Sequence, residues 1–191
     1  MLGGPLLLSA NYNYSNITNL DATASEERVY MLIPGCVSCD IVAGKRVEPG
    51  GVIYENDYWH IGTMGSSPVV WRGFLSIKLK RHCEHLAELS SEEALALGPV
   101  IQSTCLALTE VLKPAKVYVC SFGDGVKHVH LWVLPRPSDM RPGMHPAIFN
   151  LDMRTTLTRL LGIKKWIVSD DEVAGIAKQL RECLCRQQNH N

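Results

Sequence analysis

Apolar and polar residues alternate with a period of two in the middle of the chain, which is the pattern of β-strands. Residues 73–80 alternate in this way and predict a strand with one buried face and one solvated face. Residues 52–55 and 58–61 are rich in β-branched and aromatic side chains, and they flank Asn56-Asp57. These two runs predict a hairpin or a meander.

A second hairpin is predicted around the turn residues Gly123-Asp124-Gly125. Residues 116–122 are β-branched and aromatic, and residues 127–136 alternate, so the two strands are expected to pair antiparallel. One face of the second strand carries two imidazoles and an indole, and the other carries aliphatic side chains. The first face consists of His128, His130, Trp132 and Leu134, and the second of Val129, Leu131 and Val133. A solvated strand more often carries Thr, Lys or Glu, so the first face is a candidate for phosphate chemistry.

The residues that follow Ser90 predict a long amphipathic helix. Ser90 and Glu93 have the spacing of a capping box, and apolar residues then recur at helical spacing to about Leu112. Pro99 lies inside this segment, where it removes a backbone hydrogen bond and is expected to kink or break the helix. A helix packed on the predicted strands gives an α+β domain.

The length of the chain fits one domain with a sizeable core and is too short for two of ordinary size. We expect a partly disordered tail in residues 1–34, a domain in residues 35–137, and an extension in residues 138–191 packed on that domain. The extension is predicted to contain a helix in residues 151–161 and, after a capping box at Ser169, a terminal helix of about four turns.

Composition and charge point to a cytoplasmic protein. The 19 basic and 19 acidic residues leave a formal charge of +0, which gives no indication of a nucleic-acid surface or a polybasic membrane contact. Seven cysteines are an odd and scattered set, unlike a secreted disulfide framework. The apolar run 2–10 lacks a preceding basic segment and is too short to span a bilayer, so no membrane partner is expected.

Residues 128–136, which read HVHLWVLPR, resemble the signature of the histidine triad family, His-φ-His-φ-His-φ-φ with φ apolar, often followed by Pro-Arg. Two of the three histidines and every apolar position match, and Trp132 stands at the third histidine. The resemblance covers roughly residues 36–137. Further features in the family's order are Cys36-x-x-Cys39, Tyr54-Glu55, Gly73 opening a strand that ends in Lys80-Arg81-His82, and the helix after Ser91. It implies an antiparallel sheet of about five strands, a long helix packed on it, a C-terminal helix, and a homodimer.

The same resemblance implies a structural zinc site. Some members of the family bind zinc through the Cys-x-x-Cys pair, the histidine after the Lys-Arg pair and the first triad histidine. Those positions hold Cys36, Cys39, His82 and His128, and two thiolates with two imidazoles make a closed tetrahedral set. His85, one turn beyond His82, competes for a ligand position. Buried thiols and a redox pair remain alternative interpretations of the two cysteines.

The resemblance also implies that His130, the middle histidine, is the nucleophile that carries a nucleotidyl group. A neutral imidazole on a rigid strand is a good nucleophile toward phosphorus. The expected activity is hydrolysis of, or nucleotidyl transfer from, dinucleoside polyphosphates or nucleotide conjugates. Amide groups of the glycine-rich turn are expected to face the phosphate. The expected substrate-binding residues are Ser121, Gly123, Gly125, Trp132 and Arg136.

Two departures from the family pattern leave other functions open. The indole of Trp132 donates one hydrogen bond but cannot exchange a proton, so this position supplies no general acid. A related branch, which resembles galactose-1-phosphate uridylyltransferases, has glutamine there and still transfers nucleotides. Asp124 stands where part of the family has a phosphate-binding glutamine. The alternatives are a catalytically weak or inactive nucleotide-binding regulatory protein, and a small zinc-stabilised interaction domain.

Overall fold

The structure is a computed structural model that describes residues 30–64, 71–140, 142 and 168–188. The expectations for residues 1–29 and for a helix in residues 151–161 therefore lie outside the described residues. In chain order the elements are α1 (Val37–Val42), β1 (Tyr54–Glu55), β2 (Trp59–Thr63), β3 (Leu75–Leu79), the short 3-10 helix η2 (Leu86–Glu88), α2 (Ser91–Leu112), β4 (Lys116–Cys120), β5 (His130–Arg136) and α4 (Asp170–Gln188).

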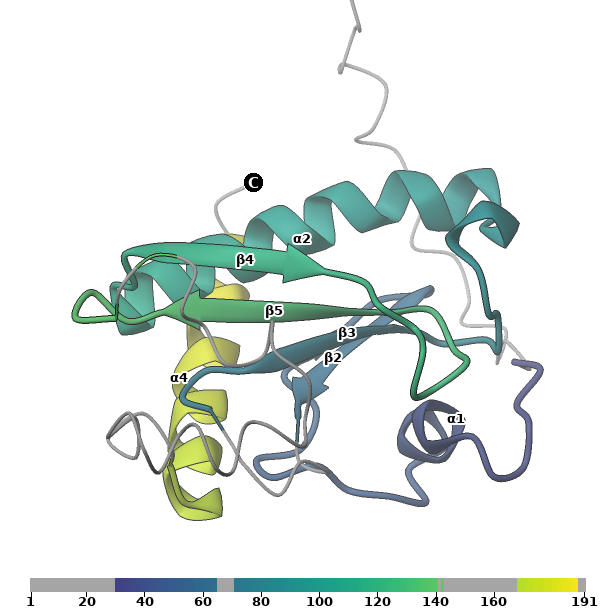
Figure 1. Cartoon of the computed structure of the whole chain (residues 1–191), viewed down its shortest axis with the longest axis horizontal. Helices are drawn as coiled ribbons and strands as arrows, with labels where there is room; N and C mark the ends of the chain where they lie inside the picture. Colours follow the sequence, from purple (N-terminus) through teal and green to yellow (C-terminus); the bar gives the residue numbers. More distant parts are fainter. Residues whose placement is uncertain (1–29, 65–70, 141, 143–167, 189–191) are drawn as a thin grey trace, which may run out of the picture.

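The strands form one antiparallel sheet of five in the order β1-β2-β3-β5-β4 (Figure 1). Asn56 makes the first turn, because its side-chain oxygen accepts hydrogen bonds from the backbone amides of Tyr58 and Trp59. The second hairpin joins β4 to β5, as the sequence predicted. The α+β fold class with about five strands is confirmed.

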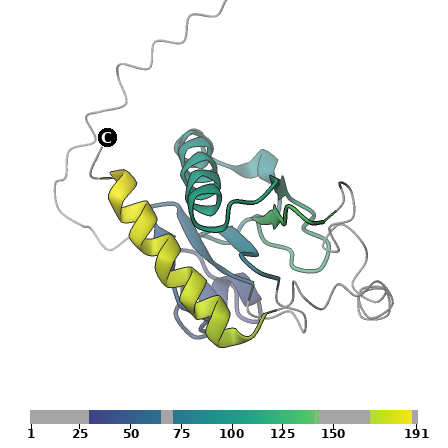
Figure 2. The same ribbon diagram turned by 90° about the vertical axis from the view of Figure 1, so that its left-hand side faces the viewer.

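Helices α2 and α4 pack on the sheet, and both contribute to one apolar core (Figures 1 and 2). The aliphatic residues of the central strands meet aliphatic residues of these helices there, and Ile77, Val133, Leu108 and Leu180 are all at most 1% exposed. The predicted aliphatic face of β5 is part of this core. This helix-covered face therefore contains the main hydrophobic core.

Helix α2 begins at the predicted capping box, in which Ser90 and Glu93 exchange both hydrogen bonds. Pro99 does not divide the helix, which continues to Leu112 and ends at Lys113 in the left-handed conformation (φ 47°, ψ 51°). Pro99 leaves the carbonyl of Leu95 without its helical partner, and both residues are exposed, so water can bind that carbonyl. The expected break at Pro99 is therefore wrong.

Two further properties of the helices bear on the sequence predictions. Among the described residues, α2 is the one helix long and apolar enough to cross a membrane by length and composition. Its buried residues, Val100, Thr104, Ala107 and Leu108 among them, pack toward the sheet in this structure. Helix α4 buries one apolar stripe, formed by Val173, Ile176, Ala177, Leu180 and Leu184. It has 19 residues, which is about five turns instead of the expected four.

The face of β3 opposite the helices is buried, and the expectation of a solvated face there is wrong. Ser76 and Lys78 are only 1% and 2% exposed. Lys78 is covered because Glu48, from the segment before β1, accepts hydrogen bonds from its ammonium at 2.8 and 3.0 Å. Next to it, a second apolar cluster of Trp71, Phe74, Leu134 and Met140 lies away from the main core.

Strand β5 begins at His130, later than the expected start at residue 127. The His128 amide donates to the Val126 carbonyl at 2.8 Å, and the Val129 amide donates to the Cys83 carbonyl at 2.6 Å. These bonds turn the chain just before the strand. His128 therefore precedes the ladder, and the two histidines do not share a strand face as predicted.

Candidate functional site

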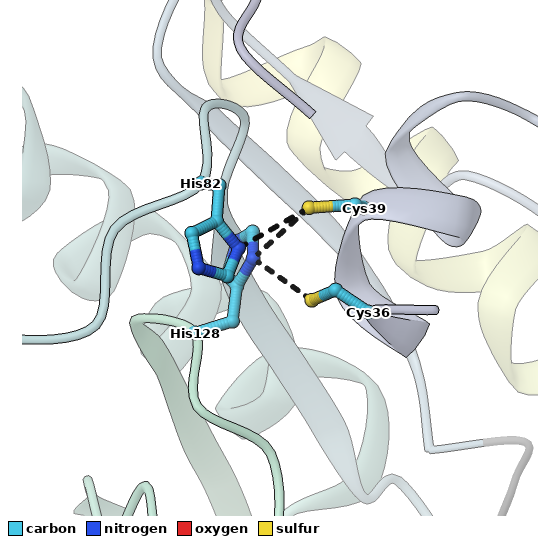
Figure 3. A group of neighbouring side chains, drawn as sticks. All are labelled: Cys36, Cys39, His82 and His128. Atoms are coloured by element: carbon cyan, nitrogen blue, oxygen red, sulfur yellow. Dashed lines mark hydrogen bonds between the residues drawn. The ribbon is translucent and has the colours of Figure 1, made fainter. Parts of the chain in front are cut away.

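Four metal-ligating side chains from three separate segments meet at one end of the sheet (Figure 3). Cys36 is the residue before α1 and Cys39 lies in its first turn, so both thiols project from the same side of this short helix. His82 follows β3 and His128 precedes β5. One ligand atom from each residue lies within 4.8 Å of every other. The structure thus brings together all four residues of the predicted metal site.

The distances within this Cys2His2 cluster fit a tetrahedral metal ion. The Cys36 sulfur lies 3.5 Å from Nδ1 of His128, and the Cys39 sulfur lies 3.5 Å from Nδ1 of His82 and 3.6 Å from Nδ1 of His128. Bond lengths of about 2.3 Å to sulfur and about 2.0 Å to nitrogen place tetrahedral ligands roughly 3.5 Å apart. The donor set is therefore both chemically and geometrically suited to zinc.

A hydrogen bond to the Leu79 carbonyl orients the His128 ring so that it faces the two cysteines of the cluster. Its Nε2–H donates to the Leu79 carbonyl at 2.7 Å, which leaves the lone pair of Nδ1 directed at the two sulfurs. Burial lowers the pKa of His128 to about 4, so the ring is neutral and able to bind a metal at neutral pH. Burial raises the pKa of Cys39, and a metal must displace the proton of that thiol.

The positions of the side chains bear on the alternative interpretations of the predicted metal site. His85 is exposed and does not belong to the cluster, so it does not replace His82. Cys36 and Cys39 carry free thiols and are not joined as a disulfide. Two histidines beside them distinguish the group from an isolated thiol pair.

His130, the predicted nucleophile, is the first residue of β5 and is 9% exposed. Its Nδ1–H donates to the His128 carbonyl at 2.7 Å, so Nε2 keeps its lone pair. Burial lowers the pKa of His130, the hydrogen bond to His128 opposes this, and the charge of Lys78 lowers the pKa further. The imidazole is therefore held as a neutral ring with one defined nucleophilic nitrogen.

Among the predicted substrate-binding residues, Ser121 lies beside His130, because its hydroxyl donates to the His130 carbonyl at 3.2 Å. Gly123 and Gly125 lie in the loop that joins β4 to β5 and have open space where a side chain would project. Gly123 has a φ of +72°, a conformation that L side chains rarely adopt. Arg136 is at the opposite end of β5 from His130, and its guanidinium donates to the Met140 carbonyl. The structure does not bring Arg136 to the predicted nucleophile.

Trp132 lies two residues beyond His130, with 6.4 Å between the centroids of their rings. The buried ring of Phe74 and the half-exposed ring of Phe122 each meet Trp132 edge-on, with centroids 5.3 Å apart. These are favourable aromatic geometries. The indole at the third triad position is therefore fixed in an aromatic cluster next to the predicted nucleophile.

Sequence reasoning missed a buried polar row beside His130. Lys78 is directly opposite His130 on the neighbouring strand, and His60 is directly opposite Lys78 on the next one. Glu48 binds Lys78 and lies 3.8 Å from Nε2 of His60. Glu48 is separated from Lys78 by 30 residues of sequence. The cross-strand positions of His60 and Lys78 follow from strand register, which the sequence pattern alone did not define.

Solved structures with this arrangement of elements are found at low sequence identity. A hypothetical histidine triad nucleotide-binding protein from Sulfolobus tokodaii has a TM-score of 0.58 at 14% identity, covering 80% of this chain and 94% of its own. A zinc-bound histidine triad family protein from Mycobacterium smegmatis has a TM-score of 0.58 at 20% identity, covering 82% and 98%. This chain has the histidine triad fold.

The histidine triad fold is also found in a larger protein similar to this chain. A structure of uridylyltransferase has a TM-score of 0.52 at 18% identity, covering 79% of this chain and 45% of its own. No family model and no curated protein matches the sequence. The fold therefore agrees with the resemblance carried by residues 128–136.

Proposed function

We propose that this protein is a nucleotide-processing enzyme of the histidine triad superfamily that works through a covalent nucleotidyl adduct on His130. The observation that carries the proposal is the hydrogen bond from Nδ1 of His130 to the His128 carbonyl at 2.7 Å. This bond fixes the tautomer and leaves Nε2 to attack phosphorus. The same carbonyl also stabilises the positive ring of an adduct formed at Nε2.

The reaction divides into two steps. Nε2 forms a bond to the phosphorus atom while the bond from phosphorus to the leaving oxygen breaks. Water or another acceptor then attacks phosphorus and releases the histidine. Trp132 cannot give a proton to the leaving group, which favours groups that leave as stable anions. Dinucleoside polyphosphates and activated nucleotide conjugates have such leaving groups.

The test of this proposal is intact-mass spectrometry of the protein quenched soon after mixing with a dinucleoside polyphosphate. We expect a mass increase of one nucleotidyl group in the wild type and none in His130→Ala. Turnover by His130→Ala at the wild-type rate, with no adduct in any quenched wild-type sample, rules the proposal out.

We further propose that the Cys2His2 cluster binds a structural zinc ion, which would pin α1 to the start of β5. The support is the donor set and its tetrahedral spacing. All four ligand positions are taken by protein atoms, so the ion has no open site for substrate. Metal analysis of protein purified without chelator is expected to give about one zinc per chain. A metal-free protein that melts at the same temperature as protein with zinc contradicts the assignment.

A second candidate function is a nucleotide-binding protein with weak or absent catalysis, and the packing of Trp132 favours it. Its indole is fixed between Phe74 and Phe122 at the position where the family has a histidine. The variant Trp132→His separates the two functions. Strong activation of an inactive protein supports the binding function, whereas little change in an active protein supports the enzyme.

The family resemblance supports a proposal on assembly, and the odd, scattered set of cysteines supports one on the compartment. We propose a homodimer in the cytoplasm, where free thiols such as those of the cluster stay reduced. Sedimentation of the purified protein tests the assembly, and a monomer at micromolar concentration contradicts it.

A further inference from the structure

A buried cation lies next to the proposed nucleophile. Lys78 on β3 is paired directly with His130 on β5, and directly opposed residues of antiparallel strands project from the same face with Cβ atoms about 5 Å apart. Lys78 is 2% exposed and His130 is 9% exposed. The ammonium and the imidazole therefore share one enclosed region of the sheet.

The position of Lys78 is held by an ion pair. Its Nζ donates to both carboxylate oxygens of Glu48, at 2.8 and 3.0 Å, and both side chains are almost fully buried. Burial lowers the pKa of Lys78, and the Glu48 carboxylate opposes this shift. A buried ion pair gains little stability over apolar residues of similar size, because desolvation of the two charges offsets their attraction. Stability alone does not explain a lysine at this position.

The chemistry at His130 needs positive charge, and within the described residues the other positions of the motif do not supply it. A phosphate bound at Nε2 brings negative charge into a buried site. Trp132, at the third triad position, is uncharged, and Arg136 is at the other end of the strand. His128 belongs to the Cys2His2 cluster, and its Nδ1 faces the two sulfurs. Charge fixed in a region of low dielectric acts strongly on a neighbouring group.

We infer that Lys78 stabilises the phosphate bound at His130 through the field of its ammonium, with Glu48 as the residue that positions it. The inference rests on the proposed function and extends it to the substrate: the ligand is recognised by the charge of its phosphate. Lys78 thereby compensates for the cation that a third histidine would provide. Glu48 acts through Lys78 and is a positioning residue.

The residue directly after β3 supplies a control. Lys80 lies two residues from Lys78, and its Nζ is 3.3 Å from Glu55 in an ion pair that is less buried. Lys78→Met/Glu48→Gln and Lys80→Met/Glu55→Gln therefore each remove one lysine and one glutamate charge of an ion pair. Removing both partners avoids an unpaired buried charge, which would itself destabilise the fold. Melting temperature and zinc content show whether each double variant is folded.

Two readouts are measured on both double variants and the wild type. The first is the affinity for the nucleoside monophosphates and for the matching uncharged nucleosides, by calorimetry. The second is the rate of nucleotidyl adduct formation, by quenched intact-mass spectrometry. In Lys78→Met/Glu48→Gln we expect about tenfold weaker binding of monophosphate with unchanged nucleoside affinity, and an adduct rate lower by about 100-fold. In Lys80→Met/Glu55→Gln we expect wild-type values in both.

Wild-type monophosphate affinity and adduct rate in Lys78→Met/Glu48→Gln overturn the inference while leaving the His130 adduct, and with it the proposed function, intact. Equal losses in both double variants, or equal losses for monophosphate and nucleoside, also overturn it because they indicate a structural role. No nucleotide binding and no adduct in the wild type overturn the proposed function as well. If Lys78→Met/Glu48→Gln does not fold, Lys78→Gln/Glu48→Gln, in which two neutral amides replace the ion pair, must show the same selective loss for monophosphate.

Discussion

The two faces of the sheet differ in what holds their side chains in place. On the helix-covered face, aliphatic residues of β2, β3 and β5 pack against α2 and α4, and the contacts are nondirectional. On the opposite face, the ion pair of Lys78, the hydrogen bond of His130 and the aromatic contacts of Trp132 each require a specific geometry. The first face contains the main hydrophobic core, and the second holds the residues of the proposed chemistry. Substitutions should therefore separate into effects on stability and effects on activity.

The largest expected effect is on the polar face, in His130→Ala. Loss of the nucleophile should reduce turnover by about 10⁴-fold, equivalent to roughly 5 kcal/mol of transition-state stabilisation. The ring lies on the face opposite the main core and donates one hydrogen bond, to the His128 carbonyl, so the melting temperature should fall less than after a core truncation. Steady-state kinetics and thermal unfolding measure the two quantities. The control is His85→Ala, which changes an exposed histidine outside the site and should retain full turnover. Equal losses of turnover in the two variants contradict the separation of effects on activity from effects on stability.

Metal removal should have the next largest effect, because the Cys2His2 cluster links α1 to the start of β5. Zinc present at 1,000 times its dissociation constant stabilises the fold by about 4 kcal/mol. Chelation should then lower the melting temperature by roughly 10 °C. Cys39→Ser should show a low melting temperature with and without chelator. Cys185→Ser, an exposed cysteine, should respond to chelator as the wild type does.

The sequence predicted the helix-covered face better than the polar face. The capping box at Ser90 and the spacing of apolar residues in α2 and α4 are local signals, and both helices formed where expected. The Cys2His2 cluster was predicted through the resemblance to a known family. The pair of Lys78 and Glu48 was not predicted, because a lysine in an alternating strand normally indicates a solvated face and its partner is remote in sequence.

The turn before β5 shows a second limit of the sequence pattern. Alternation continues unbroken from residue 127, so it indicates one uninterrupted strand. The strand begins at His130 because the amide of Val129 bonds to the Cys83 carbonyl in the segment after β3. That bond is a tertiary contact with no local signature. It separates His128, a proposed metal ligand, from the proposed nucleophile.

On the helix-covered face, Leu108→Ala tests the packing. Leu108 is 0% exposed in the main core, and its truncation leaves a cavity that should cost about 3 kcal/mol of unfolding free energy. Denaturant unfolding measures this loss. Turnover per folded molecule should stay at the wild-type level, because Leu108 lies on the opposite face from His130. Leu106→Ala, an exposed leucine on the same helix, should change stability by less than about 0.5 kcal/mol.

The smallest expected effect is at the start of α2, in Ser90→Ala. The Ser90 hydroxyl accepts a hydrogen bond from the Glu93 amide at 3.2 Å, and the Glu93 carboxylate accepts one from the Ser90 amide at 2.8 Å. The substitution removes the first bond and the bond that the hydroxyl donates to the Glu92 carboxylate at 2.8 Å. The second bond of the cap remains, because Glu93 is also held by Arg81 at 2.6 and 2.7 Å. The expected loss is about 1 kcal/mol of unfolding free energy with turnover unchanged. Ser91→Ala, whose side chain is exposed and outside the cap, should be neutral; a loss of activity in Ser90→Ala indicates that α2 influences the polar face across the sheet.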